Sequence, residues 1–226
     1  MNYNSIYVRI LTKDSVSHRI THNTSKNILL RKECFILYES DLDIFISPPT
    51  LSTERLLLRK LTVSDYKDMY EYSKLPETSR YLLWSPHETP RFTKKYLSYL
   101  QGEYRGGRFY DFAVVEKKSG KMIGTCGFTS IDLVNNGAEV GYVLSPAFWG
   151  QGYGAEALRC VMRFGFLELG VHRMEARIME GNTASMRVAE KCGMRREAVH
   201  KDAMLIKGAY RTIVEYAVLA EEFRAR

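Results

Sequence analysis

The sequence contains no long run of apolar residues. A transmembrane helix needs about 20 consecutive apolar residues, and every apolar stretch of this chain is far shorter. The N-terminus also lacks the basic start and the long apolar core of a secretory signal. We therefore expect a cytoplasmic protein without a membrane partner.

Cysteine is scarce as well, and none of the cysteines shows a C-x-x-C spacing. A zinc cage is therefore not expected. His18 and His22 have the i, i+4 spacing of a helical metal site, but the glutamate of an H-E-x-x-H motif does not follow His18. We expect no metal, and reduced thiols in or near the core. The four cysteines are Cys34, Cys126, Cys160 and Cys192.

The chain also lacks a run of basic residues and any RNA-binding signature, so a nucleic-acid partner is not expected. Its hydrophobic content of 45% and charged content of 26% are those of an ordinary globular protein. The length suits one domain plus an extension. The net charge of +7 favours an anionic partner such as a phosphorylated cofactor.

One stretch combines a strand, a glycine-rich turn and an amphipathic helix. Residues 138–144 alternate as a strand does, glycines follow at 150, 152 and 154, and apolar residues then recur at helical spacing as far as Leu169. The first N–H groups of a helix have no partner within it and lie at the positive end of its dipole. Because glycines let a bulky anion approach, the stretch predicts a phosphate or pyrophosphate site.

Several kinds of protein use such a turn. A P-loop needs Gly-Lys-Ser/Thr after its glycines, but Ala155 and Glu156 follow Gly154 here, so that class is excluded. The dinucleotide pattern G-x-G-x-x-G/A matches at Gly150, Gly152 and Ala155. It leaves a nicotinamide-dependent oxidoreductase as an alternative, although only one strand–helix–strand unit is visible.

A third kind of protein matches several separated motifs in order. The turn WGQGYGAEAL resembles the acetyl-CoA motif R/Q-x-x-G-x-G/A of the GNAT acetyltransferases at Gly152 and Gly154, with Trp149 where Arg or Gln is usual. The segments TERLLLR, AEVGYVLSPAFWG and EGNTASMRVAEKCGMRREA also resemble this family. They are most similar to the branch that includes the ribosomal-protein N-terminal acetyltransferases. The resemblance runs from about Leu51 to the C-terminus.

The resemblance implies an α/β (α+β) GNAT fold. We expect a mixed, mostly antiparallel twisted sheet of about seven strands, flanked by about four helices. We expect residues 51–226 to form the acetyltransferase domain and residues 1–50 to form an N-terminal extension. The extension packs on the domain, exchanges between subunits or is disordered, and the protein is a monomer or a homodimer.

Outside the glycine-rich turn, the local patterns predict most of the remaining elements. They predict a hairpin over 36–46, a strand over Leu51–Leu61, a helix capped by Ser64, a helix from near Pro90 to before Gly106, strands on either side of Lys118–Gly120, a turn at Asn135–Gly137, a strand over His172–Glu180, a helix over Thr183–Lys191 ended by Gly193, and two strands around Lys207 and Gly208.

The resemblance also implies an activity: transfer of an acetyl group from acetyl-CoA to a primary amine, by direct attack of the amine on the thioester. The acceptor is then a protein or peptide N-terminus or a small-molecule amine. Val143 and Leu144 would offer backbone groups to the pantetheine arm, and an N–H near Val143 would polarise the thioester carbonyl. The pyrophosphate would be held by the backbone of Gly150, Gln151, Gly152, Tyr153, Gly154 and Ala155.

Three residues are candidates for contacts at the reacting centre. An α-amine, with a pKa of about 7.7–8.0, needs only a modest base, and Glu139 on the strand beside the acetyl site is the candidate, acting directly or through water. The alternative is a solvent-facing or salt-bridged glutamate. The N-x-x-S pattern of the ribosomal branch is matched by Asn182, which would contact the pantetheine arm or a water, and by Ser185, which would face the sulfur. The alternative is that both residues cap a helix.

Some positions depart from the family or face the acceptor. Many members carry a tyrosine where this chain has Ala189, and some relatives carry a glutamate near the position of Met204. These departures leave a non-catalytic acyl-CoA-binding or regulatory module as an alternative, and the second weakens the expectation of a ribosomal-protein substrate. We expect Tyr81 and Trp84 to contact the acceptor, with a core position as the alternative for Trp84. We expect His87 to be an exposed loop residue.

Overall fold

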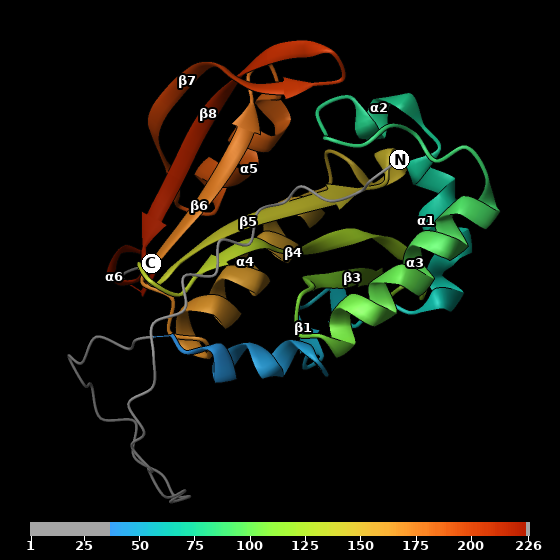
Figure 1. The fold of residues 1–226 in the computed structure, drawn as a ribbon, viewed down its shortest axis with the longest axis horizontal. Helices are drawn as coiled ribbons and strands as arrows, with labels where there is room; N and C mark the ends of the chain where they lie inside the picture. The colour runs from blue at the N-terminus through green and yellow to red at the C-terminus, as the bar shows by residue number, and fades with distance from the viewer. Residues whose placement is uncertain (1–36, 225–226) are drawn as a thin grey trace, which may run out of the picture. The chain divides into compact units, whose positions relative to one another are not determined.

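The computed structural model describes residues 37–224, which form one sheet with helices on both faces (Figure 1). Eight strands follow the order β1-β2-β3-β4-β5-β6-β8-β7. Every neighbouring pair is antiparallel except β5 with β6. The predicted mixed, mostly antiparallel sheet is confirmed. It has one strand more than predicted because the segment Leu51–Leu61 forms two short paired strands instead of one.

The elements have the following bounds. The strands are β1 (Leu51–Ser52), β2 (Leu56–Arg59), β3 (Tyr110–Glu116), β4 (Met122–Asp132), β5 (Gly137–Leu144), β6 (Arg173–Met179), β7 (Arg195–Ile206) and β8 (Ala209–Leu219). The α-helices are α1 (Tyr66–Ser73), α2 (Pro76–Ser79), α3 (Pro90–Arg105), α4 (Tyr153–Leu167), α5 (Thr183–Lys191) and α6 (Ala220–Arg224). The 3-10 helices are η1 (Glu39–Phe45), η2 (Val63–Asp65) and η3 (Pro146–Phe148).

The two faces of the sheet are covered by different helices (Figure 1). Side chains of successive strand residues point to opposite faces. On β5, Ala138, Val140 and Leu144 are buried in the larger core together with residues of α4 and α5. Val143 packs instead on the smaller core, which contains residues of α1 and α3. Residues of β5 with even numbers therefore face α4, and those with odd numbers face α1 and α3.

Strands β5 and β6 are paired only where they begin. Residues 137–139 pair with residues 173–175, and the ladder ends there although both strands continue. Figure 1 shows the two strands diverging beyond this point. We call the resulting gap in the ladder the wedge. The wedge opens toward the C-terminal ends of β5 and β6. Because α4 begins just after β5 ends, the open end of the wedge lies close to the start of α4.

The first helix of the domain is capped differently from the prediction. Helix α1 follows the turn η2, which Thr62 caps in place of the predicted Ser64. The Asp65 carboxylate accepts the Thr62 backbone N–H at 2.8 Å and pairs with the Arg59 guanidinium at 2.7 Å. Ser64 was a plausible cap by residue type, but the carboxylate that closes the capping box sits three residues after Thr62.

The end of the predicted extension packs on the core. Residues 36–46 were predicted as a hairpin, but η1 lies there, because the Asp41 carboxylate accepts the Tyr38 N–H at 2.7 Å and so starts a helical turn. The Phe45 side chain is fully buried, with its ring centre 4.8 Å from that of Tyr110 and 6.2 Å from that of Phe164. The rest of the extension, including the two histidines and the first cysteine discussed above, lies outside the described residues.

The three described cysteines are free thiols, as predicted. Cys126 and Cys192 are buried and Cys160 is half-buried, and burial raises the pKa of the Cys192 thiol to about 11. Between residues 37 and 224, no helix is both long and apolar enough to cross a membrane. Over the same range, no three His, Cys, Asp or Glu side chains gather in a way that could hold a metal ion.

Candidate active site

The glycine-rich turn lies between the end of β5 and the start of α4. Gly150 and Gly152 have φ angles of 76° and 84°, in the left-handed region that favours glycine. The first backbone bond of α4 runs from the Glu156 N–H to the Gly152 oxygen at 3.1 Å. No side chain in the described part of the chain caps this helix. The N–H groups of residues 153–155 therefore remain available to an outside acceptor.

Side chains of the segment Thr53–Arg55 hold this turn through hydrogen bonds. The Arg55 Nε donates to Glu156 Oε2 at 2.6 Å, and its Nη1 donates to the Gln151 carbonyl at 2.9 Å. The Thr53 hydroxyl donates to Glu156 Oε1 at 2.6 Å. Burial raises the pKa of the Glu156 carboxyl, but the hydrogen bonds from Thr53 and Arg55 outweigh burial and hold that pKa below its usual value. This attachment to α4 explains why the predicted first strand is interrupted.

The side chain of Tyr153 is directed to the sheet rather than to a ligand. Its hydroxyl donates to Glu116 Oε1 at 2.5 Å, and the Ser119 hydroxyl donates to the other oxygen of that carboxylate at 2.6 Å. The Tyr153 residue is buried. It can therefore offer an anion its backbone N–H, but not its phenol.

The open edge of β5 presents backbone groups of Tyr142 and Leu144. The Ser145 N–H donates to the Ile123 carbonyl of β4 at 2.8 Å. Because successive residues of a strand direct their N–H groups to opposite edges, the Val143 N–H also faces β4. The N–H groups of Tyr142 and Leu144 then face the wedge. The N–H expected near Val143 to polarise the thioester therefore belongs to Tyr142 or Leu144 and not to Val143 itself. The expectation that Leu144 offers a backbone group to the pantetheine arm is consistent with this orientation.

Helix α5 begins beside the wedge with the predicted Asn182 and Ser185. The Asn182 Oδ1 accepts the Ser185 backbone N–H at 3.3 Å, so Asn182 does cap the helix, as the alternative had it. The Ser185 Oγ accepts a hydrogen bond from the Tyr142 hydroxyl at 3.2 Å. Sequence reasoning missed Tyr142. The alternation of side chains along β5 was the available signal, because it puts Tyr142 on the same face of the sheet as the buried Val140 and Leu144. Ala189, where many relatives carry a tyrosine, is buried.

Glu139 lies at the closed end of the wedge, on the opposite face of the sheet from Tyr142. Burial raises the pKa of the Glu139 carboxyl, and the neighbouring Arg177 opposes that effect. Within residues 37–224, Glu139 is not in an ion pair, whereas Arg173 pairs with Glu175 at 2.7 Å. The salt-bridged alternative is therefore not observed. Glu139 lines a hollow of about 430 Å³ with Ser130, Asp132, Asn135, Gly137, Ala138, Arg173, Glu175, Arg177 and Glu215.

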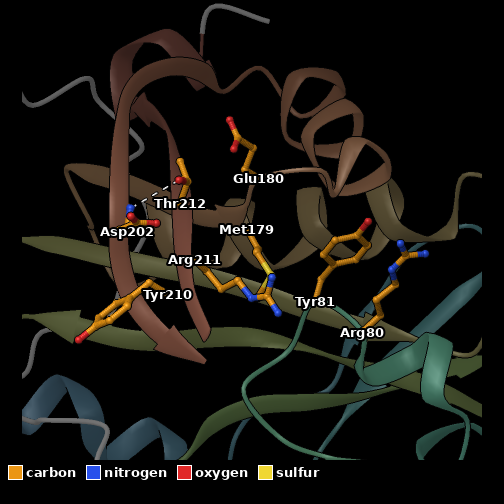
Figure 2. A pocket seen from close by; sticks show the side chains of 8 residues that line it. All are labelled: Arg80, Tyr81, Met179, Glu180, Asp202, Tyr210, Arg211 and Thr212. Atoms are coloured by element: carbon orange, nitrogen blue, oxygen red, sulfur yellow. Dashed lines mark hydrogen bonds between the residues drawn. The ribbon is translucent and has the colours of Figure 1, made fainter. Parts of the chain in front are cut away.

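A second hollow, of about 520 Å³, lies between the α2 segment and the β7–β8 hairpin (Figure 2). We call it the hairpin hollow. Figure 2 shows Arg80 and Tyr81 on one side and residues of β6, β7 and β8 on the other. Its four charged side chains form no ion pair with any described residue. The lining residues are Arg80, Tyr81, Met179, Glu180, Asp202, Tyr210, Arg211 and Thr212.

Two hydrogen bonds join the sides of the hairpin hollow. The Tyr81 hydroxyl donates to the Gly181 carbonyl at 3.1 Å, and the Lys207 ammonium donates to the Ser79 carbonyl at 2.6 Å. Met204, where some relatives carry a glutamate, packs on an apolar cluster with Tyr81 and residues of β6 and β8. Met204 itself does not line the hollow; the residues of this cluster that do are Met179 and Tyr81.

Trp84 does not line the hairpin hollow. It is half-buried, and its ring centre is 5.4 Å from that of His87. The prediction of an exposed His87 is wrong: the residue is buried beneath the rings of Phe92 and Tyr96, and its Nδ1 lies 2.8 Å from the Thr93 hydroxyl. Burial lowers the pKa of His87. A contact between Trp84 and an acceptor stays a prediction.

Comparison with known proteins assigns this geometry to a family. Residues 55–195 match the acetyltransferase (GNAT) domain. The chain belongs to the GNAT acetyltransferase family. It is 30% identical over 174 residues to an uncharacterized N-acetyltransferase of Bacillus licheniformis, and the match covers 77% of this chain and 98% of that protein. The predicted family is therefore confirmed.

Solved structures of GNAT proteins share the fold. The acetyltransferase from Bacillus anthracis is 28% identical, with a TM-score of 0.69 over 76% of this chain and 99% of the other. RimL, a ribosomal alpha-N-protein acetyltransferase solved with coenzyme A, is 23% identical, with a TM-score of 0.65 over 76% of this chain and 98% of its own. RimL is by its name a member of the ribosomal-protein branch that the sequence motifs resemble.

Family membership removes the oxidoreductase alternative. A dinucleotide-binding fold needs a mostly parallel, doubly wound sheet, whereas the GNAT sheet described here has a single parallel pair, β5 with β6. The chain is an N-acetyltransferase, and its family uses acetyl-CoA. The turn leaves room for a ligand at Gly150, where a Cβ would meet no atom within 4 Å beyond its chain neighbours, and the N–H groups of residues 153–155 have no side-chain cap.

Proposed function

We propose that this GNAT protein transfers the acetyl group of acetyl-CoA to a primary amine, and that a peptide or protein N-terminus is its preferred acceptor. The observation that carries the proposal is the wedge. It opens beside the uncapped start of α4, and Glu139 and Ser185 lie on its opposite faces. A small-molecule amine is the alternative acceptor.

The turn and the edge of β5 would hold the donor. The N–H groups of residues 150–155 lie at the positive end of α4, which favours a pyrophosphate. Arg55, bonded to the Gln151 carbonyl, adds a positive charge beside the turn. The Leu144 N–H would donate to the pantetheine arm, and the amide NH₂ of Asn182, whose Oδ1 accepts the Ser185 N–H, would contact the same arm.

Proton transfer would be divided between the faces of the sheet. Acetyl-CoA supplies an acetyl group that is activated as a thioester. Glu139 would take the proton that the attacking amine loses, because a carboxyl with a raised pKa is closer to an α-amine of about 7.7–8.0. The Tyr142 N–H would donate to the carbonyl oxygen as its negative charge develops. Ser185 would donate a hydrogen bond toward the sulfur.

The charges of the hairpin hollow support a peptide acceptor. Two arginines, Arg80 and Arg211, and two carboxylates, Glu180 and Asp202, line this hollow. A site for a polyamine or an aminoglycoside would need an excess of carboxylates, because complementary charge selects a polycation. A balanced lining suits a peptide that carries one ammonium group and side chains of either charge. Ribosomal-protein N-termini are one class to test, since RimL shares the fold.

The first experiment measures coenzyme A release with N-terminal peptides, polyamines and aminoglycosides, and binding of acetyl-CoA by calorimetry. We expect binding, and release with peptides. Release with polyamines alone would overturn the acceptor, and absence of binding would overturn the proposed site. Gly152→Asp should abolish binding by placing a carboxylate in the turn. Its matched control is Gly120→Asp, a left-handed glycine (φ 69°) in the β3–β4 turn.

The remaining expectations stay proposals of the same kind. We retain a cytoplasmic location, and a monomer or a homodimer. We retain residues 51–226 as the acetyltransferase domain, to which the segment 37–49 adds buried side chains. Sedimentation of the full chain at several concentrations would decide the oligomeric state.

A further inference from the structure

We propose that Tyr142 acts as a positioning residue for Ser185, directing and polarising the serine hydroxyl so that its proton points at the leaving sulfur. The inference rests on the proposed acetyl transfer and assigns it one further residue. Tyr142 lies on β5 and Ser185 on α5, and these are the two elements that lie beside the wedge on its α4 face.

The position of the Tyr142 side chain is fixed from two sides. Its ring covers the start of α4, where a Cβ on Gly154 would stand 3.3 Å from a ring carbon. Its hydroxyl donates to Ser185 Oγ at 3.2 Å. The Ser185 backbone is held in turn, because the Asn182 side chain accepts its N–H at 3.3 Å. The two hydroxyls therefore meet between elements that are separately anchored.

This bond decides where the serine proton goes. A serine hydroxyl has one proton to donate and two lone pairs. When Tyr142 donates to a lone pair, the serine proton stays free, and no described residue accepts it. A serine in a helix often bonds to the carbonyl one turn earlier, but Ser185 lies in the first turn of α5, so that carbonyl, on Gly181, precedes the helix and accepts the Tyr81 hydroxyl. A hydroxyl that accepts a hydrogen bond is also a stronger donor.

The reaction step balances with Tyr142 keeping its proton. The C–N bond forms as the C–S bond breaks, the electron pair of the C–S bond moves to sulfur, and the proton of the amine goes to Glu139. Burial raises the pKa of Tyr142 to about 12, although the bond to Ser185 lowers it. An ordinary thiol has a pKa of about 8.5. The phenol therefore does not give up its proton to the thiolate. It donates to Ser185, and the Ser185 hydroxyl stabilises the sulfur's negative charge through its own hydrogen bond.

The arrangement compensates for a residue that this chain lacks. The tyrosine that the family resemblance leads one to expect on this helix is Ala189 here, and Ala189 is buried. In this protein a phenol reaches the same helix from β5. Ser185 alone would be a weak donor with a freely rotating proton, and Tyr142 supplies the missing orientation.

The test measures the pKa of the coenzyme A thiol in its complex with the protein, from the ultraviolet absorbance of the thiolate against that of the free protein. A hydrogen bond to a charged group contributes roughly 10- to 100-fold. We expect the thiol pKa to be higher by about one unit in Tyr142→Phe than in the wild type, and kcat to fall by about 10-fold or more. Phenylalanine keeps the ring over Gly154, so the fold should persist.

A double-mutant cycle separates this inference from other roles. In a Ser185→Ala background, Tyr142→Phe should have no further effect on kcat or on the thiol pKa. The matched control is Tyr216→Phe, which removes another tyrosine hydroxyl bond to α5, from Tyr216 to Glu190 at 3.2 Å. It should leave the thiol pKa unchanged.

Each remaining outcome is informative. An unchanged thiol pKa in Tyr142→Phe, with only a lower melting temperature, would show a structural role and overturn the inference. An additional loss in the double variant would show that Tyr142 acts on sulfur directly, which would overturn its role as a positioning residue for Ser185. Either result would leave the proposed acetyl transfer intact if the wild type releases coenzyme A, and that function fails only if no acceptor supports release.

Discussion

The indole N–H of Trp149 donates a hydrogen bond to the carbonyl oxygen of Leu144 at 2.8 Å. Leu144 is the last residue of β5, and its carbonyl lies on the edge that faces the wedge. Trp149 occupies the position where the GNAT motif usually has Arg or Gln. Like those residues, tryptophan carries an N–H donor, and it uses this donor to tie the loop before α4 to the end of the strand.

Replacing Trp149 with phenylalanine should weaken acetyl-CoA binding. The variant keeps an aromatic ring but leaves the Leu144 carbonyl without its partner. The net loss of one hydrogen bond, about 1 kcal/mol, corresponds to about a fivefold higher Kd. Calorimetry measures the Kd, and kcat should stay the same. Trp149→Arg restores a donor and should bind near the wild-type level; equal Kd values for all three proteins would refute the role of this bond.

Replacing Glu156 with glutamine should destabilise the protein at neutral pH but not in acid. The folded-state pKa of Glu156 is depressed. Its stabilising effect is therefore present above the unfolded pKa of about 4.3 and is lost as the pH falls through the lower folded value. The melting temperatures of the two proteins should differ at pH 7 and converge below about pH 4. A constant difference across this range would contradict the assigned pKa shift.

Replacing Glu139 with glutamine should slow acetyl transfer and stabilise the fold. Loss of a general base costs about 10²- to 10⁴-fold in kcat. The folded-state pKa of Glu139 is raised, so its cost to stability appears as the pH rises from the unfolded value of about 4.3 through the folded value. Glutamine removes that cost, and the melting temperature at pH 7 should rise. A slower enzyme with a lower melting temperature would point to a structural role.

Replacing Lys207 with methionine should affect the acceptor but not the donor. Its ammonium ties the β7–β8 hairpin to the Ser79 carbonyl at 2.6 Å, which fixes one side of the hairpin hollow. We expect the acceptor KM to rise about three- to tenfold, the equivalent of about one hydrogen bond, with the Kd for acetyl-CoA unchanged. Lys201→Met, on the same hairpin and exposed, is the control with the same change of charge.

Replacing Phe45 with alanine should strongly destabilise the domain. The side chain is fully buried among the rings of Tyr110, Phe128 and Phe164. Truncating such a phenylalanine costs about 3–5 kcal/mol in the free energy of unfolding, which urea denaturation measures. The control is Ile46→Ala at a partly exposed neighbour, where a change within about 0.5 kcal/mol is expected. A small effect of Phe45→Ala would mean that the segment 37–49 is dispensable to the domain.

Elements with local signals were predicted closely. Helix α5 runs over Thr183–Lys191 as predicted, because Asn182 caps its start and Gly193, with φ of 92°, follows its end. The sequence of β5, turn and α4 was predicted for the same reason, since left-handed glycines are needed at 150 and 152 whatever surrounds them. Such signals act over a few residues, so the chain carries them without its tertiary structure.

Elements fixed by distant partners were predicted wrongly. The strand expected over Leu51–Leu61 breaks because Arg55 binds Glu156, which lies 101 residues further along the chain. His87 is buried because α3 folds its rings over it. A 3-10 helix, η1, forms over Glu39–Phe45 where a hairpin was expected over 36–46, and the rings around Phe45 belong to β3, β4 and α4.

The sequence by itself therefore determined the family, the glycine-rich turn and the residue types of the candidate site, because these depend on backbone conformation and on motifs of a few residues. Only the tertiary structure decided which groups meet. It turned the N–H groups of Tyr142 and Leu144, and not that of Val143, toward the wedge. It also brought Tyr142 to Ser185, 43 residues away in the chain. Strand β5 and helix α5 both pack against α4, and a hydrogen bond depends on distance in space, not along the sequence.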